Sequence, residues 1–265
     1  MPGAERPPEA GRGRGLTPGP GIPADPIPGP AGRDAAALLC VGTVDLLGLM
    51  PRASNYTFLA RVSDGAAQAL AVYKPRRGEA PLWDFPDGTL HLREVAAFEL
   101  ATALGFPAVP LTVTRDGPHG PGSFQLFVPA DPQEHYFTLR ERRPEDFRAV
   151  AAFDVVANNA DRKSGHCLLG EDGRIWLVDH GVCFNVEPKL RTVIWEFAGE
   201  PLPTEVAEAV GRVAGELRSG PLADRMRQLL SPDEVEATTR RAERLLRAGR
   251  FPEPRGGRPY PWPPI

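Results

Sequence analysis

The sequence predicts an α+β protein of two lobes, with a strand-rich first half and a helix-rich second half. Three observations lead to this fold class. Short apolar segments separated by turn residues fill the chain up to about residue 130, helical patterns dominate after it, and the two kinds of element do not alternate as they would in a parallel α/β sheet. We expect a strand-rich N-terminal lobe over residues 34–130 and a helical lobe over residues 131–250.

The first lobe is expected to begin with three antiparallel strands. They are predicted over residues 43–50, 56–62 and 68–74, with turn residues between them. A helix follows over residues 90–104, where apolar residues recur at helical spacing and Gly105 ends the pattern. Two further strands are predicted over residues 111–114 and 123–128.

The second half changes to helices around one short hairpin. Helices are predicted over residues 145–158, 205–217 and 233–248. After the first of these, a loop over residues 159–166 leads into a hairpin that turns at residues 171–173. The two ends of a hairpin lie together, so Asp161 in the loop and Asp179 after the second strand are expected at the same end.

The composition describes a globular chain with unusual ends. The 265 residues are 42% hydrophobic and 25% charged. Residues 1–33 hold nine prolines and eight glycines, so we expect a disordered tail. Residues 251–265 hold six prolines together with Tyr260 and Trp262, and we expect an extended segment packed on the body.

The charge and the cysteines restrict the partners and the compartment. A net charge of −3 predicts no general attraction to nucleic acid or anionic membranes, and an anion would have to meet a local basic patch. The candidates for that patch are Arg240, Arg241, Arg244 and Arg247. Three scattered cysteines without a disulfide framework favour a reducing compartment. With no signal-peptide pattern and no transmembrane segment in the sequence, we expect a cytoplasmic protein.

Asp161 and Asp179 carry the chemistry of the candidate site. A carboxylate in a loop held by a preceding helix can orient a substrate hydroxyl, and Lys163 can neutralise charge on a transferring phosphoryl group. Asp179 directly follows an apolar strand, and its carboxylate suits magnesium. His166 stands where a second metal ligand is expected. Taken alone, the Asp-Arg-Lys sequence of this loop is better explained as an ordinary polar loop capped by Asn159 and Asp161.

Lys74 ends the third strand, where a buried ammonium needs an anionic partner. Glu94, in the first turn of the following helix, is the expected partner, with Glu99 as the alternative. Such a pair can hold the ammonium against nucleotide phosphates. Lys74 as an ordinary strand end at the surface is the competing interpretation.

Two further positions complete a candidate ATP site. Ser54 and Asn55 lie in the turn between the first two strands, where short polar residues can present backbone amides to phosphate. Val128 closes the fifth strand, where an interlobe linker can offer backbone groups to adenine. An ordinary hairpin turn and an ordinary linker are the alternatives.

A resemblance to a known family emerges when these positions are taken together. They are Lys74, Glu94, Asp161 with Arg162, and Asp179 with His180 and Gly181. In type, order and spacing they resemble the phosphatidylinositol 3-/4-kinase-like superfamily, in particular its small bacterial members, and more distantly HipA-type kinases. The similarity runs from about residue 42 to residue 251.

The resemblance implies a two-lobed protein-kinase-like fold and a role for each position. Lys74 would contact nucleotide phosphates, Glu94 would pair with it, Asp161 would be the catalytic aspartate and Asp179 would chelate magnesium. Lipid kinases of the superfamily have histidine after Asp-Arg and close the loop with an asparagine metal ligand. Lys163 and His166 stand at those places here, and imidazole is a softer ligand than amide oxygen and favours zinc, iron or manganese over magnesium.

Two functions therefore follow as expectations. The first is an ATP- and metal-dependent phosphotransferase, with magnesium or manganese, that acts on a hydroxyl of a protein or small molecule. The second is a catalytically weak or inactive nucleotide-binding scaffold or sensor with the same fold. A third hypothesis takes His166, Cys167, His180 and Cys183 as a zinc site, although neighbouring strand residues such as His166 and Cys167 point to opposite faces.

Overall fold

The computed structural model describes residues 33–51, 55–254 and 256–265. Residues 1–32 of the predicted tail and Ser54 of the predicted phosphate-binding turn lie outside the described residues. Arg33, the last residue of the predicted tail, begins a helix.

An antiparallel sheet forms the first part of the fold. Its strands are β1 (Thr43–Leu49), β2 (Phe58–Ser63), β3 (Gln68–Pro75), β4 (Thr112–Gly117) and β5 (Gly120–Leu126). They lie in the order β1-β2-β3-β5-β4. The first three agree with the predicted strands within two residues. For β4 and β5 the predicted bounds were wrong, because the ladder continues to the pair Gly117 and Gly120, where the Gly and Pro residues had indicated a longer turn.

Helices and one short hairpin make up most of the rest of the fold. The described residues form α1 (Arg33–Val41), α2 (Leu90–Leu104), α3 (Tyr136–Leu139), α4 (Pro144–Ala157), α5 (Thr204–Ser219), α6 (Pro221–Arg227) and α7 (Pro232–Ala248). A hairpin of β6 (Cys167–Leu169) and β7 (Ile175–Leu177) follows the 159–166 loop. The predicted α+β class and the four predicted helices are confirmed. The sequence analysis missed α1, α3 and α6, which are too short to show a sustained helical period.

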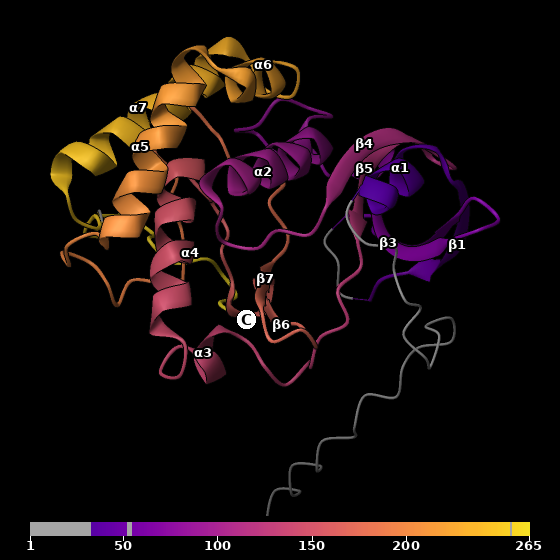
Figure 1. Cartoon of the computed structure of the whole chain (residues 1–265), viewed down its shortest axis with the longest axis horizontal. Coiled ribbons are helices and arrows are strands. Elements are labelled where there is room, and N and C mark those ends of the chain that lie inside the picture. Colours follow the sequence, from indigo (N-terminus) through magenta and orange to yellow (C-terminus); the bar gives the residue numbers. More distant parts are fainter. Residues whose placement is uncertain (1–32, 52–54, 255) are drawn as a thin grey trace, which may run out of the picture.

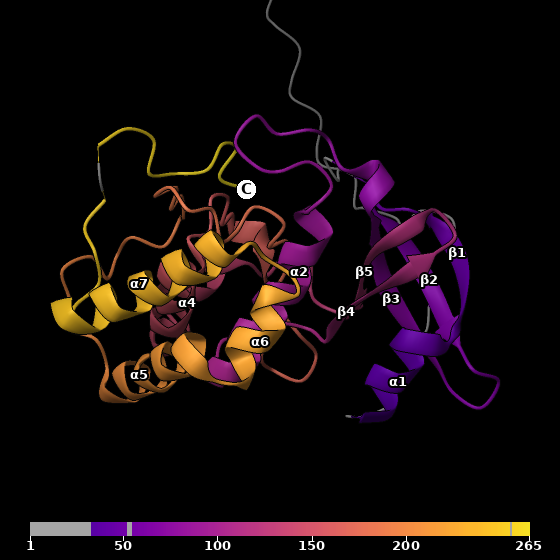
Figure 2. The same ribbon diagram turned by 90° about the horizontal axis from the view of Figure 1, so that it is seen from above.

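Figures 1 and 2 show how these elements divide the molecule. The sheet and α1 form one side, α4, α5, α6 and α7 form the other, and α2 lies between them. Gly105 allows α2 to end sharply, because its φ of 82° is a left-handed conformation that glycine adopts without strain. None of the described helices is both long and apolar enough to cross a membrane.

The described residues form two hydrophobic cores. In the smaller one, Leu38 and Leu39 of α1 cover Ala71 and Tyr73 of β3. Successive side chains of a strand point to opposite faces, so Lys74, next to Tyr73, is directed away from this core.

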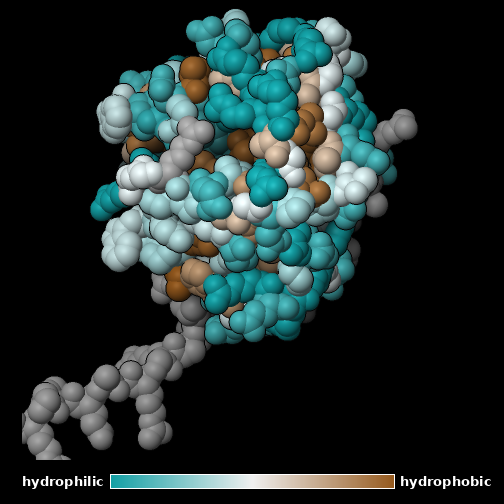
Figure 3. Space-filling model, turned by 90° about the vertical axis from the view of Figure 1, so that its left-hand side faces the viewer, coloured by the Kyte–Doolittle hydropathy of each residue, from teal (hydrophilic) through white to brown (hydrophobic). Residues whose placement is uncertain are grey.

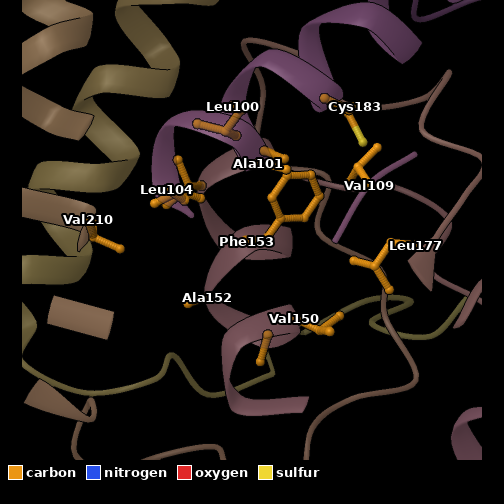
Figure 4. Packing of buried hydrophobic residues seen from close by; sticks show 14 of the residues in the cluster. Leu100, Ala101, Leu104, Val109, Val150, Ala152, Phe153, Leu177, Cys183 and Val210 are labelled. Atoms are coloured by element: carbon orange, nitrogen blue, oxygen red, sulfur yellow. The ribbon is translucent and has the colours of Figure 1, made fainter. Parts of the chain in front are cut away.

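The larger core joins α2 to the helical part. Figure 4 shows the ring of Phe153 on α4 directed at Ala101 on α2, with Leu100 and Val150 nearby. These four side chains are buried, as are those around them. The packing fixes α4, and with it the start of the 159–166 loop.

A buried ion pair also connects α2 to α7. Arg93 of α2 is 1% exposed, and its guanidinium donates to Glu234 Oε1 and, at 2.8 Å, to the carbonyl oxygen of Cys183. The second carboxylate oxygen of Glu234 accepts a hydrogen bond from the Ser231 N–H at 2.9 Å, as part of a capping box. Glu234 thus contributes both to the N-terminal cap of α7 and to the contact between α7 and α2.

Replacing Glu234 tests the contribution of this ion pair. We expect Glu234→Ala to lower the free energy of unfolding by about 3–5 kcal/mol, because it leaves the buried Arg93 charge unpaired. Glu236→Ala is the control, because it removes only an exposed pair with Arg240 and should cost less than about 1 kcal/mol. Urea denaturation measures both, and equal losses would contradict the role given to Glu234.

Candidate active site

Lys74 joins two carboxylates from separate elements. Its ammonium donates to Glu94 Oε1 on α2 and, at 2.9 Å, to Asp179 Oδ1 after β7. The Glu94 side chain is 3% exposed, whereas that of Asp179 is 55% exposed. Glu99, the alternative partner, binds Arg225 at 2.5 Å instead. The structure therefore forms the expected Lys74–Glu94 pair and adds Asp179 to it.

The second oxygen of Glu94 extends this contact to the chain around Asp179. It accepts a hydrogen bond from the His180 N–H at 3.0 Å. Glu94 therefore fixes the ammonium of Lys74 with one oxygen and the backbone next to Asp179 with the other.

The positive charge of Lys74 and the negative charges of its two partners stabilise each other at neutral pH. Burial acts to lower the pKa of Lys74, but the negative charges of Asp179 and Glu94 outweigh it and raise that pKa. The positive charge of Lys74 in turn holds the pKa of Asp179 well below its usual value. Lys74 is therefore a cation and Asp179 an anion across the physiological range, which suits contact with phosphate and metal.

Arg162 anchors the 159–166 loop to α4. Both Arg162 and Asp154 are fully buried. The Arg162 Nη2 and Nε atoms donate to the two carboxylate oxygens of Asp154 over 3.0–3.2 Å. Asn159 and Thr192 also donate to Asp154. Because α4 is packed into the core, this pair gives the loop a rigid support.

The same guanidinium reaches the segment that carries Asp179. Its Nη1 donates to the Val178 carbonyl oxygen at 3.2 Å, and its Nη2 lies 2.9 Å from His180 Nε2. A guanidinium only donates, so Nε2 accepts and the imidazole proton lies on Nδ1. Burial and the charge of Arg162 hold the pKa of His180 well below its usual value, so this imidazole is neutral. Arg162 thereby connects the loop to the residues on both sides of Asp179.

Asp161 lies at the edge of this buried network. Its side chain is 33% exposed, and Oδ2 contacts Lys163 Nζ at 3.2 Å. Burial raises the pKa of Asp161 although the charge of Lys163 opposes the shift, and the charge of Asp179 contributes in the same direction as burial. A carboxylate with a raised pKa is a better proton acceptor than an ordinary aspartate.

His166 lies beside Asp179, as its expected metal-binding role requires. Its Nε2 is 3.5 Å from Asp179 Oδ2, and its Nδ1 accepts from the Lys163 N–H at 3.4 Å. Burial lowers the pKa of His166 to about 4 despite the opposing charge of Asp179, so the ring is neutral. With Nδ1 accepting, the ring proton lies on Nε2 and faces Asp179.

The remaining predicted nucleotide residues lie in loops of the first lobe. Asn55 Oδ1 accepts from the Ala80 N–H at 2.9 Å, so its side chain supports the loop after β3. Val128 follows β5, between Phe127, whose N–H donates to Leu70 of β3, and Pro129, whose carbonyl oxygen accepts from Glu171. Among the described residues, no backbone hydrogen bond uses the N–H or carbonyl oxygen of Val128.

The structure does not support the zinc hypothesis. Burial raises the pKa of Cys167 to about 12 and that of Cys183 well above its usual value, whereas zinc binds thiolates. Across the described parts of the chain, no three His, Cys, Asp or Glu side chains are placed to hold a metal ion.

Sequence reasoning missed the buried supports of the site. Asp154 was one polar position in an amphipathic helix, Arg93 one basic residue before Glu94, and Glu234 one acidic residue at a helix start. The usable signal was the location of Asp154 on the same side of α4 as the apolar residues Val150 and Phe153. A carboxylate on such a face requires a cationic partner.

Sequence comparisons relate the chain to known proteins. No established family profile matches the chain. It is 41% identical over 265 aligned residues to Protein Rv2133c of Mycobacterium tuberculosis, covering 87% of this chain and 95% of that protein. The chain belongs to the Rv2133c family. It is also 30% identical over 142 residues to Phosphatidylinositol 4-kinase gamma 4 of Oryza sativa subsp. japonica, covering 45% of this chain but only 25% of that protein.

A solved kinase structure shows the fold of this Rv2133c-family chain. The Helicobacter pylori proinflammatory kinase CtkA matches with a TM-score of 0.50 at 8% identity, over 80% of this chain and 94% of that one. The Golgi casein kinase matches with a TM-score of 0.47 at 15% identity, over 82% and 75%. The expected kinase-like fold is confirmed. The finer resemblance to phosphatidylinositol and HipA-type kinases stays a prediction.

A double-mutant cycle tests the support of the loop. We expect Arg162→Met to lower the free energy of unfolding by about 3–5 kcal/mol, because it leaves the Asp154 carboxylate buried without its cation. The double variant with Asp154→Leu should cost less than the sum of the single variants by at least about 1 kcal/mol. Arg174→Met, which breaks an exposed pair with Asp172, is the control and should cost less than about 1 kcal/mol. Additive losses at Arg162 and Asp154 would count against the pair.

Proposed function

We propose that this protein is an ATP- and divalent-metal-dependent phosphotransferase that acts on a hydroxyl group of a protein or small molecule. The observation that carries the proposal is the contact of Lys74 with both Glu94 and Asp179. It places a fixed cation and an exposed carboxylate side by side, as phosphoryl transfer requires. In this proposal residues 34–130 bind the nucleotide, residues 131–250 carry the catalytic groups, and a cytoplasmic location fits the three free cysteines.

Residues of the first lobe would bind ATP. Lys74, held by Glu94, would contact the α- and β-phosphates with its ammonium. The turn that contains Ser54 and Asn55 would cover the phosphates. Val128 would hydrogen-bond adenine, which is supported by the absence of backbone partners for its N–H and carbonyl oxygen among the described residues.

Asp179 fits the requirements of a magnesium ligand. Magnesium usually takes one or two protein carboxylates together with phosphate oxygens, and the Asp179 carboxylate is both ionised and accessible. When bound, magnesium or manganese would neutralise charge on the phosphate oxygens. His166 lies close enough to Asp179 to be the second ligand through Nε2, but its ring proton would first have to move to Nδ1, with loss of the hydrogen bond from the Lys163 N–H.

Asp161 and Lys163 would act on the phosphate acceptor. The raised pKa of Asp161 suits it to accept or orient the proton of the attacking hydroxyl. Lys163, now paired with Asp161, would exchange that partner for the negative charge of the transferring phosphoryl group.

A second function is favoured by the identity of His166. A neutral imidazole whose N–H faces Asp179 does not offer magnesium the oxygen ligand it prefers. On this ground the protein would bind nucleotide through Lys74 and Asp179 and act as a scaffold or sensor with little or no phosphate transfer.

Replacing Asp161 distinguishes the two functions. With ATP and either magnesium or manganese, we expect wild-type protein to transfer labelled γ-phosphate to itself or to an added acceptor. Asp161→Asn should lower this rate by at least about 100-fold, because it removes the proton acceptor, while ATP still raises the melting temperature. Asp172→Asn, which changes an exposed carboxylate of the β6–β7 hairpin, is the matched control and should transfer phosphate at the wild-type rate.

The enzyme proposal fails if neither wild type nor Asp161→Asn transfers phosphate while ATP still stabilises both.

Nucleotide binding itself is tested by Lys74→Met, which should abolish the ATP-dependent rise in melting temperature.

A further inference from the structure

A pocket in the helical lobe borders the 159–166 loop through Arg191, but none of the residues assigned to the proposed active site lines it. Its volume is about 770 Å³, and it is formed by α4, α7, the segment around residues 186–191 and the C-terminal segment after α7. Lys74, Asp161 and Asp179 do not line it. Figure 3 shows the α5 and α7 side of the molecule, where hydrophilic residues cover most of the surface and hydrophobic residues are visible between them.

Positive charge is concentrated in this pocket. Its lining includes Arg191, Arg240, Arg241, Arg244, Arg250 and Arg258. The lining also holds Lys189, while Glu253 is its one carboxylate among the described residues. The whole chain has a net charge of −3, so the cluster is a local departure from the overall charge.

Within the part of the chain that the structure describes, most of these arginines lack an ionic partner. Arg240 pairs with Glu236, and Lys189 pairs with Asp84 at 2.9 Å. The other five arginines of the lining form no ion pair with any described carboxylate, although Arg250 donates to the Gly199 carbonyl oxygen at 3.1 Å. Several guanidinium groups are therefore available to an anion in the pocket.

Arg241 forms hydrogen bonds with neutral groups instead of an ion pair with any described carboxylate. It donates to the carbonyl oxygens of Val156 and Asn185 at 2.9 and 3.0 Å, and to Thr238 Oγ1 at 2.8 Å, all of them neutral acceptors. Burial lowers the pKa of Arg241 to about 10, and the charges of Arg240 and Arg244 act in the same direction. By contrast, the buried Arg93 and Arg162 both have carboxylate partners.

The walls of the pocket indicate the size and type of ligand. Trp195, Leu245 and Phe251 contribute apolar surface between the arginines. The volume falls within the range of about 300–1,000 Å³ that is usual for small-molecule sites. Guanidinium groups match phosphate oxygens through paired hydrogen bonds. A concave pocket bounded by four segments favours a compact anion over an extended one.

We propose that this pocket binds a small molecule that carries several phosphate groups. The proposal does not depend on phosphotransferase activity, because the lining shares no residue with the proposed active site. The five unpaired arginines would supply hydrogen bonds and charge, and the aromatic and aliphatic walls would hold the body of the ligand.

Calorimetric titration with two probes, myo-inositol hexakisphosphate and inorganic tripolyphosphate, tests the proposal. We expect saturable binding of one hexakisphosphate per chain in EDTA, weakened by added salt. The variant Arg244→Gln/Arg258→Gln should bind about tenfold or more weakly, since two charge-assisted contacts are lost. Both side chains are exposed, so the fold should be retained, which circular dichroism checks.

Two controls separate this site from others. Arg247→Gln removes an exposed arginine of the same helix that is paired with Glu243 and lies outside the pocket, and it should leave hexakisphosphate affinity unchanged. Lys74→Met should also leave it unchanged, which distinguishes the pocket from the ATP site. The proposal is overturned if neither probe binds, if Arg247→Gln weakens binding as much as the double variant, or if only an acidic peptide or an RNA oligonucleotide binds through these arginines.

Discussion

The arrangement of both lobes depends on two neighbouring charged residues of α2 that are buried in opposite contacts. Arg93 reaches into the helical lobe, where it binds Glu234 and the carbonyl oxygen of Cys183. Glu94 reaches the sheet through Lys74 and the segment after β7 through the His180 N–H. Because a buried charge without its partner is costly, α2 has one position in which both residues are satisfied. That position brings Lys74 and Asp179 together.

A second buried ion pair fixes the position of the loop that carries Asp161. Arg162 and Asp154 are wholly buried, and the guanidinium also contacts Val178 and His180. The loop, the β6–β7 hairpin and α4 therefore share one set of hydrogen bonds. Asp161 and Asp179 lie at the accessible edge of this network, so the fold combines a rigid interior with charged groups that a ligand can reach.

The sequence was sufficient to predict the residues whose roles follow from local pattern. Lys74 at a strand end, Glu94 near the start of a helix, and Asp161 and Asp179 at the two ends of a hairpin could all be placed without coordinates. The partner of Arg93 could not, because Glu234 is 141 residues away along the chain and its position depends on how helices pack. The pocket of arginines is of the same kind, since the predicted basic patch on α7 indicated neither Arg191 nor Arg258.

The backbone at Asp179 limits which residues can occupy that position. Its φ of 62° lies in the left-handed region, which aspartate, asparagine and glycine tolerate and which costs other residues about 1 kcal/mol or more. Within the family, a change to asparagine or glycine could therefore remove the carboxylate and leave the fold intact, whereas a β-branched residue would disturb the chain as well. Loss of chemistry and loss of structure are thus separable at this position in evolution.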